Sequence, residues 1–153
     1  MKLVTDFARQ FGVDLRIDEC LIVRRESRCF LLNESLKKLA AKDFFHAGIY
    51  LGKTKKDVFF PSFSLLTMIA EKKANKVFVD RRTEWLFICG RDIFKQGIKK
   101  MEGSKRKGGH TLVLNEYGEC LGFGRIMHDL GEATDGVVVK NVSDIGDFLR
   151  REK

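Results

Sequence analysis

The sequence predicts an α+β protein in which two small units pack against each other. Residues 1–75 alternate helical patterns with two β-hairpins, whereas residues 76–153 consist mostly of short apolar strands punctuated by glycine. No linker rich in Gly, Ser or Pro separates the halves, and a unit of about 75 residues lies near the lower size limit for independent stability. We therefore expect two domains, 1–75 and 76–153, that share an interface.

The first unit begins with a helix over residues 3–11, where apolar side chains recur at helical spacing. Two short apolar segments follow, 20–23 and 29–32, and the charged stretch between them predicts the turn of a hairpin. Asn33 is a favourable N-cap for a helix over 36–41, because its side chain can accept a hydrogen bond from a free backbone N–H.

A second hairpin is predicted from 48–51 to 58–60, around a polar turn rich in lysine. Ser62 or Ser64 can cap the helix that follows over 63–73. The apolar residues of this helix share one face, and lysines occupy its last turn, where cations suit the helix dipole. Residues 1–75 should therefore form an antiparallel sheet with helices packed on it.

The second unit consists of short strands, predicted at 77–79, 86–89, 111–114, 121–126 and 137–139. Because strand 86–89 is apolar, Cys89 is expected to be a buried, inert thiol. One short helix is expected after Gly90, and a last helix runs from Ser143, a good N-cap, through Leu149. This half should be mostly β.

Composition excludes several classes of protein. Hydrophobic residues make up 44% and charged residues 33% of the 153 residues, which is globular composition. No run approaches the roughly 18 apolar residues of a membrane helix, and Asp6 stands where a signal peptide would need its apolar core. The four cysteines form no C-x-x-C pair and the three histidines are scattered. We expect an intracellular, soluble protein, located in the cytoplasm or, in a eukaryote, in the nucleus or nucleolus, without a metal, cofactor or disulfide scaffold.

Three short matches to catalytic or nucleotide-binding motifs are incomplete. Gly52-Lys53-Thr54 ends like a P-loop, but Ala47 stands where its first glycine should be. Gly122-Phe123-Gly124 lacks the third glycine of a dinucleotide fingerprint, and glycines within a strand more often mark a bulge or barrel corner. His128-Asp129 could act as the base and the orienting carboxylate of a catalytic triad, but the sequence has no Ser or Cys in a nucleophile turn for such a pair to activate. The sequence offers no positive case for an enzyme.

Charge is the remaining signal. The net charge is +8, of which residues 1–75 contribute +5 and residues 76–153 contribute +3. The positive charge of the second half is more clustered, and its densest cluster precedes Gly108-Gly109, so that we expect a loop there. The cations of this cluster are Lys99, Lys100, Lys105, Arg106 and Lys107.

Two further basic groups lie in the second half. Arg91, Lys95 and Lys99 would share one face of a helix over 91–99. Arg150, Arg151 and Lys153 close the last helix. Any one group alone can be a solvated surface, but three together favour a polyanionic partner. Clustered cations bind adjacent phosphates tightly, because binding releases the counterions that surround those phosphates. Most aromatic residues fall within apolar runs, so they are expected in the core and identify no stacking platform.

The second half resembles a PUA domain, an RNA-binding module, in the order and spacing of its glycines and strands across residues 76–153. The segments that carry the resemblance are Lys76-Val77-Phe78-Val79-Asp80, Gly90-Arg91-Asp92-Ile93-Phe94, Gly108-Gly109, Glu119-Cys120-Leu121-Gly122-Phe123-Gly124-Arg125 and Gly136-Val137-Val138-Val139. The chain departs from the PUA pattern at Gly108-Gly109, where Gly-Asp is common. The resemblance implies a C-terminal PUA pseudo-β-barrel beside the N-terminal sheet.

Three segments narrow the resemblance to the Nip-seven ribosome-biogenesis family, in its archaeal-type form. They are Thr83-Glu84-Trp85-Leu86-Phe87-Ile88-Cys89-Gly90, Leu121-Gly122-Phe123-Gly124 and the tail from Ser143 to Glu152. Members of that family pair a pre-PUA α/β domain with a C-terminal PUA domain. Residues 48–70 resemble the family's hairpin and helix, and residues 1–45 match more loosely.

This resemblance implies a non-enzymatic factor that binds uridine-rich precursor ribosomal RNA during assembly of the large ribosomal subunit. It implies RNA contact at Arg150, Arg151 and Lys153 on the last helix, and the wider PUA pattern adds Arg91 and Lys95. The cluster from Lys99 to Lys107 would add nonspecific attraction. Other assembly or processing factors are expected to dock on residues 1–75.

Two alternatives remain from the residues themselves. The chain can be a protein-interaction adaptor that recruits assembly factors or RNA-processing enzymes, or an accessory protein of RNA modification. Salt-dependent binding of RNA would distinguish an RNA-binding factor from a protein-interaction adaptor. Turnover of labelled RNA by the purified chain would indicate a modifying enzyme.

Overall fold

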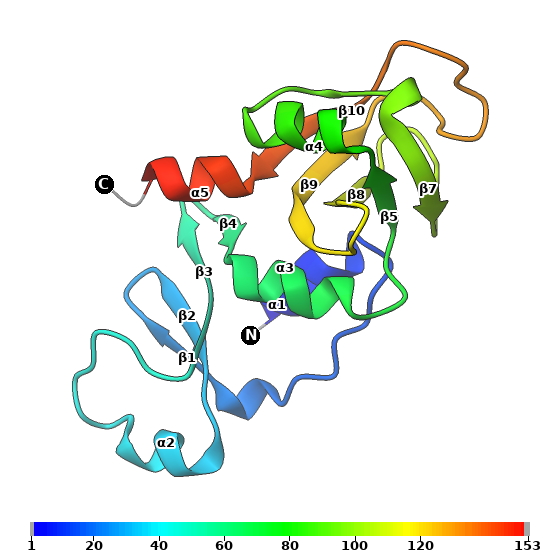
Figure 1. The fold of residues 1–153 in the computed structure, drawn as a ribbon. Coiled ribbons are helices and arrows are strands. Elements are labelled where there is room, and N and C mark those ends of the chain that lie inside the picture. Colours follow the sequence, from blue (N-terminus) through cyan, green and yellow to red (C-terminus); the bar gives the residue numbers. More distant parts are fainter. Residues whose placement is uncertain (1, 152–153) are drawn as a thin grey trace.

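The computed structural model describes residues 2–151, apart from the side chains of Phe148 and Arg151. The first half forms α1 (Lys2–Arg9), η1 (Glu19–Leu21), β1 (Ile22–Arg25), β2 (Arg28–Leu31), α2 (Glu34–Leu39), β3 (Ile49–Lys55), β4 (Val58–Pro61) and α3 (Phe63–Ala70). The second half forms β5 (Lys76–Val79), α4 (Arg81–Ile88), β6 (Ile93–Phe94), η2 (Lys95–Gly97), β7 (Ile98–Glu102), β8 (His110–Leu114), β9 (Cys120–Ile126), β10 (Val137–Asp144) and α5 (Ile145–Arg151). Figure 1 shows α1 and α3 between the two β-rich parts.

The first sheet is antiparallel, with its strands in the order β1-β2-β3-β4. The predicted caps are confirmed: the Asn33 side chain accepts from the Leu36 N–H at 2.8 Å, and Ser62 Oγ accepts from the Leu65 N–H at 3.1 Å. Strand β3 is longer than predicted and runs through Gly52-Lys53-Thr54. These three residues are therefore part of a strand, and the second turn contracts to Lys56-Asp57.

The second sheet has six strands in the order β6-β10-β9-β8-β5-β7. All its pairs are antiparallel except β5 with β8, and the sheet curls into a half-barrel (Figure 1). Strands β6 and β7, which follow each other in the chain, lie at the two edges of this order. The sheet therefore separates residues that are close in sequence.

The prediction of a strand at 86–89 is wrong, because residues 81–88 form helix α4. Asp80 accepts a hydrogen bond from the Thr83 N–H at 2.7 Å and caps the helix, and that bond lowers the pKa of the Asp80 carboxyl. Of this apolar run only Phe87 is buried, whereas Trp85 is 66% exposed. A helix buries one face of such a run, so its apolar residues do not all reach the core.

The helix expected over 91–99 is also absent. Strand β6 pairs with β10, a single 3₁₀ turn follows, and β7 pairs with β5. Backbone pairing with two different strands outweighs the helical spacing of the three cations in this segment. Lys99 and Lys100 therefore lie on a strand and not in the predicted loop, which begins after Glu102.

Cys89 is exposed, contrary to expectation, because it caps the end of α4. Cys20 is exposed as well, whereas Cys29 and Cys120 are buried, and burial raises the pKa of the Cys120 thiol to about 11. We expect Ellman's reagent to label Cys20 and Cys89 in the folded protein and all four thiols in guanidinium chloride. The variant Cys89→Ser should leave one reactive thiol, and an unchanged count in that variant would contradict the exposure of Cys89.

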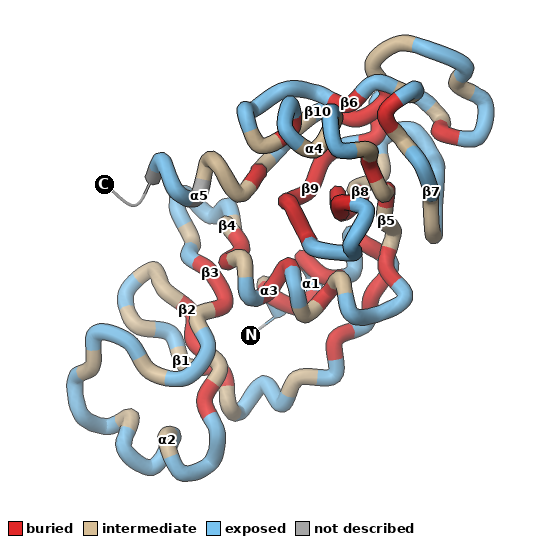
Figure 2. Tube along the Cα trace, in the orientation of Figure 1, coloured by how far each residue is buried: buried red, intermediate tan, exposed pale blue. Residues whose placement is uncertain are grey.

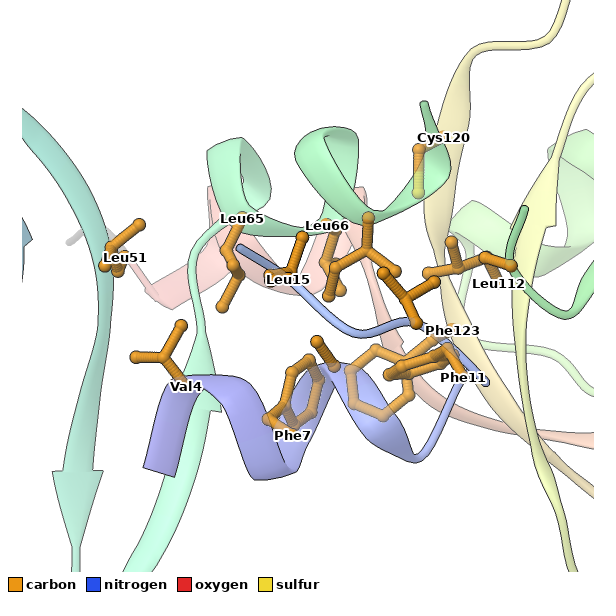
Figure 3. Packing of buried hydrophobic residues seen from close by; sticks show 14 of the residues in the cluster. Val4, Phe7, Phe11, Leu15, Leu51, Leu65, Leu66, Leu112, Cys120 and Phe123 are labelled. Atoms are coloured by element: carbon orange, nitrogen blue, oxygen red, sulfur yellow. The ribbon is translucent and has the colours of Figure 1, made fainter. Parts of the chain in front are cut away.

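The main hydrophobic core belongs to both halves. Its buried residues come from α1, α3 and the first sheet and also from β8 and β9, which contribute Leu112, Leu114, Cys120 and Phe123. Buried residues gather where α1 and α3 meet these strands (Figure 2). The rings of Phe7 and Phe11 lie 5.6 Å and 5.5 Å from that of Phe123, edge to face (Figure 3). A second cluster, around Phe87, Ile93 and Val138, lies within the half-barrel.

Candidate nucleic-acid interface

The C-terminal helix is anchored by a half-buried amide, Asn141, and a buried carboxylate, Asp144. Asn141 Nδ2 donates to the Phe87 carbonyl at 2.9 Å and to Asp144 Oδ2 at 3.1 Å, and the Asn141 N–H donates to Asp92 Oδ1 at 2.9 Å. Asp144 Oδ1 accepts from the Asp147 N–H at 2.8 Å. Asp144, and not the predicted Ser143, therefore caps α5 and ties it to the end of α4.

Gly146 allows α5 to begin directly against α4. A Cβ atom at this position would collide with the Ile88 carbonyl oxygen and approach Asp144 Oδ1. This close approach brings Arg91, which follows α4, to the same end of the second half as Arg150. Arg150 Nη2 lies 3.6 Å from Asp144 Oδ1, and both arginines are exposed. They can therefore reach the same polyanion.

The rest of the predicted C-terminal group is placed only in part. Arg151 belongs to α5, so its backbone follows that of Arg150, but its side chain is outside the described part. Lys153 lies beyond the described residues. The exposed helix end and Arg91 form the candidate site that we call the α4–α5 end.

Lys99 and Lys100 lie on the outer edge of the sheet. Both are exposed on β7, and Lys100 Nζ forms an ion pair with Glu102 Oε1 at 2.7 Å and lies 5.0 Å from the centre of the Phe78 ring. The hydrogen bond from Lys100 lowers the pKa of Glu102. Part of the positive charge that was predicted to contact RNA is thus neutralised by Glu102 on the same strand.

The loop that carries Lys105, Arg106 and Lys107 packs on a second, acidic loop. The Leu130 N–H donates to the Lys105 carbonyl at 2.9 Å, and Lys107 lines a hollow with Asp129, Glu132 and Asp135. Lys95 points the same way, because its Nζ donates to the Leu130 carbonyl at 2.5 Å. The basic loop therefore faces carboxylates of its own chain.

The structure divides the predicted site into two groups. Helix α5 and strand β7 lie on opposite sides of the half-barrel (Figure 1). The prediction that Arg91, Lys95 and Lys99 share one face is wrong, because β6 and β7 lie at opposite edges of the sheet. Arg91 and Arg150 come together at the α4–α5 end, and the other cations surround β7 and the loop after it.

Sequence reasoning missed a basic row on the first sheet. Arg25, Arg28 and Lys53 stand opposite one another on three neighbouring strands. The only signal was the charged segment 24–28, which was interpreted as a turn, and the register that aligns it with Lys53 cannot be read from spacing alone.

The described residues contain neither a cluster of metal ligands nor a membrane-spanning helix. Within residues 2–151, no three His, Cys, Asp or Glu side chains gather as ligands for a metal ion. No helix in that range is long and apolar enough to cross a membrane.

Residues 75–153 match the family model described as the UPF0113 PUA domain. A UPF0113 protein from Archaeoglobus fulgidus is 30% identical over 114 residues, which cover 71% of this chain and 63% of that protein. The chain thus spans less than two thirds of the length of this relative.

Two solved structures share the fold over almost the whole chain. A conserved PUA domain protein from Thermoplasma acidophilum superposes with a TM-score of 0.64 at 23% identity, covering 99% of this chain and 92% of the other. A hypothetical protein from Pyrococcus horikoshii gives 0.62 at 18% identity with the same coverage. Both halves, and not the half-barrel alone, therefore belong to a fold that these two archaeal proteins share.

Proposed function

This chain belongs to the UPF0113 PUA domain family, and from this premise we propose that it is a non-enzymatic RNA-binding factor of large-subunit ribosome assembly. The PUA domain is generally an RNA-binding domain. The proposed RNA is precursor ribosomal RNA, with a preference for uridine-rich segments, and the proposed site of action is the cytoplasm. The domains 1–75 and 76–153 act together as one binding unit.

The α4–α5 end is the observation that carries this proposal. Arg91 and Arg150 are exposed there on elements that Asn141 and Asp144 hold in place. Arginine suits phosphate because its planar guanidinium can donate two parallel hydrogen bonds. Cations whose backbone is held by packed elements lose less conformational entropy on binding than cations on a mobile tail would.

The double variant Arg150→Ala/Arg151→Ala is expected to weaken binding to polyuridine and to reduce the slope of log K against log salt by about one to two units, since each lost phosphate contact removes close to one. Filter binding or fluorescence anisotropy at several salt concentrations measures both quantities. The matched control is Lys37→Ala/Lys38→Ala, which removes the same charge from exposed positions on α2. Equal affinity and slope in the folded double variant would contradict the assignment.

A protein-interaction adaptor is the second candidate. Trp85 and Tyr117 are 66% and 85% exposed, and they border a hollow with Glu84, Glu116 and Glu119. Exposed aromatic rings suit a protein interface, whereas the carboxylates beside them repel phosphate. If the wild-type chain binds neither polyuridine nor polyadenosine in a salt-dependent way, this surface becomes the leading candidate for function.

A further inference from the structure

The basic row on the first sheet, formed by Arg25, Arg28 and Lys53, carries positive charge that its own chain balances only at Arg25. Arg25, Arg28 and Lys53 are directly opposite in the register of β1, β2 and β3, where like charges destabilise a sheet. Arg25 Nη1 lies 3.7 Å from Asp43, and its Nη2 donates to the Lys42 carbonyl at 3.1 Å. In the part of the chain that the structure describes, no carboxylate forms an ion pair with Arg28 or Lys53.

This row lies on the face of the sheet that points away from α1 and α3. Cys29 and Leu51 are buried in the core against those helices, so the residues that alternate with Cys29 on β2 point outward. Arg28 is one of these residues, and it is paired with Lys53. The row continues across β4, where Lys53 pairs with Phe60.

Aromatic rings interleave with the cations on this face. The Arg28 guanidinium lies 4.6 Å from the centre of the Phe45 ring, and Phe45 is 81% exposed. Tyr50 follows on β3, with its ring 5.5 Å from that of Phe30. Alternating rings and cations are what proteins present to single-stranded nucleic acid, where rings stack on bases and cations contact phosphates.

The face ends in a groove between the two halves, with a volume of about 300 Å³. Its walls include Tyr50, Lys53, Val58 and Phe60 from the first sheet and Val142 and Asp147 from β10 and α5. An apolar slot with several aromatic rings, one cation and one carboxylate on its walls matches a nucleobase, which has flat apolar faces and a polar edge.

We propose that the outer face of the first sheet is a second RNA site: Arg28 and Lys53 bind phosphates, and the groove takes one unpaired base of the same strand. The site rests on the RNA-binding function proposed above and extends it from the PUA half to the N-terminal half. Because the groove opens beside α5, one strand can pass from the basic row to Arg150. The base must be unpaired, so the site selects single strands over duplexes.

The test uses the full chain and a fluorescein-labelled 12-nucleotide single-stranded RNA. The variant Arg28→Glu/Lys53→Glu is expected to weaken binding at least tenfold and to lower the salt slope by about two. Its matched control, Lys72→Glu/Lys73→Glu, makes the same change in net charge at exposed positions after α3, on the other side of the sheet. Its affinity should fall by a smaller factor, because only long-range attraction is lost.

The groove is tested separately with an abasic oligonucleotide, which keeps the phosphates but has no bases. Wild type should prefer the RNA with bases by about tenfold, as expected for a stacked base, and Val58→Glu should abolish that preference. Val58 is 55% exposed, so this change leaves the core intact, and circular dichroism checks the fold of each variant. The duplex of the same sequence should bind wild type more weakly than the single strand.

Four results overturn the inference. Binding by Arg28→Glu/Lys53→Glu equal to that of its control, while Arg150→Ala/Arg151→Ala weakens binding, would confine RNA to the PUA half and leave the proposed function standing. Equal binding of duplex and single strand would exclude the base site. Displacement of RNA by poly-aspartate as efficiently as by polyuridine would make the face a site for acidic proteins. No RNA binding by wild type would remove both this inference and the proposed function.

Discussion

Replacing Phe11 by alanine is expected to lower the free energy of unfolding by about 3–5 kcal/mol, because it empties a fully buried position in the core. The ring of Phe11, in the turn after α1, lies 5.2 Å from that of Phe7, on α1, and 5.5 Å from that of Phe123, on β9. Its loss therefore removes packing between the halves as well as within the first one.

Urea denaturation followed by circular dichroism measures this loss. Phe45→Ala is the control, since its ring is exposed and its removal costs only the contact with Arg28, about 0.5–1 kcal/mol. The fluorescence of Trp85, the one tryptophan of the chain, reports on the PUA half. If the halves unfold as one unit, Phe11→Ala shifts the Trp85 transition too, and an unshifted Trp85 transition would contradict the shared core.

Gly122→Ala is expected to destabilise the fold by about 3 kcal/mol or more, for two separate reasons. Gly122 has φ of +147°, a conformation that residues with a Cβ rarely adopt. A Cβ atom there would also collide with the Ser143 carbonyl oxygen and lie 2.8 Å from the Cα of Asp144. The paired strands β9 and β10 would have to separate at the point where α5 begins.

Gly108→Ala separates the two costs. Gly108 also has positive φ, +86°, but nothing lies within 4 Å of the position that a Cβ would take. It should therefore lose only about 1 kcal/mol from backbone strain, and the remainder of the Gly122→Ala effect measures the collision. Thermal unfolding of the two variants measures both losses of stability. Equal losses would show that β10 moves away from the added methyl group without lowering the free energy of unfolding.

The sequence predicts features that depend on local chemistry and misses those that depend on pairing partners. Asn33 and Ser62 cap helices as expected, because capping involves residues only three positions apart. The sequence predicts a strand around Trp85, where the structure has α4, because a short apolar run fits a strand and a buried helix equally well. Asp80 with Glu84 in the first turn was the available sign of a helix.

The candidate site shows the same division. The basic end of α5 could be predicted because its cations are consecutive in the chain. The row formed by Arg28 and Lys53 could not, since it depends on the register of β2 with β3, which shifts between Cys29 and Phe30. Lys95 was assigned to RNA from its position after Arg91, but its contact with the Leu130 carbonyl depends on a loop 35 residues away.

The shared core also constrains the order of events when the protein is made. Phe7 and Phe11 emerge from the ribosome first, but Leu112, Leu114 and Phe123, which cover them, emerge about a hundred residues later. Contacts this distant in sequence slow folding, because a long loop must close before they form. During that interval the first helix exposes an apolar face, and a chain truncated after residue 75 would keep it exposed. The N-terminal half therefore cannot complete its core until strands β8 and β9 have been made.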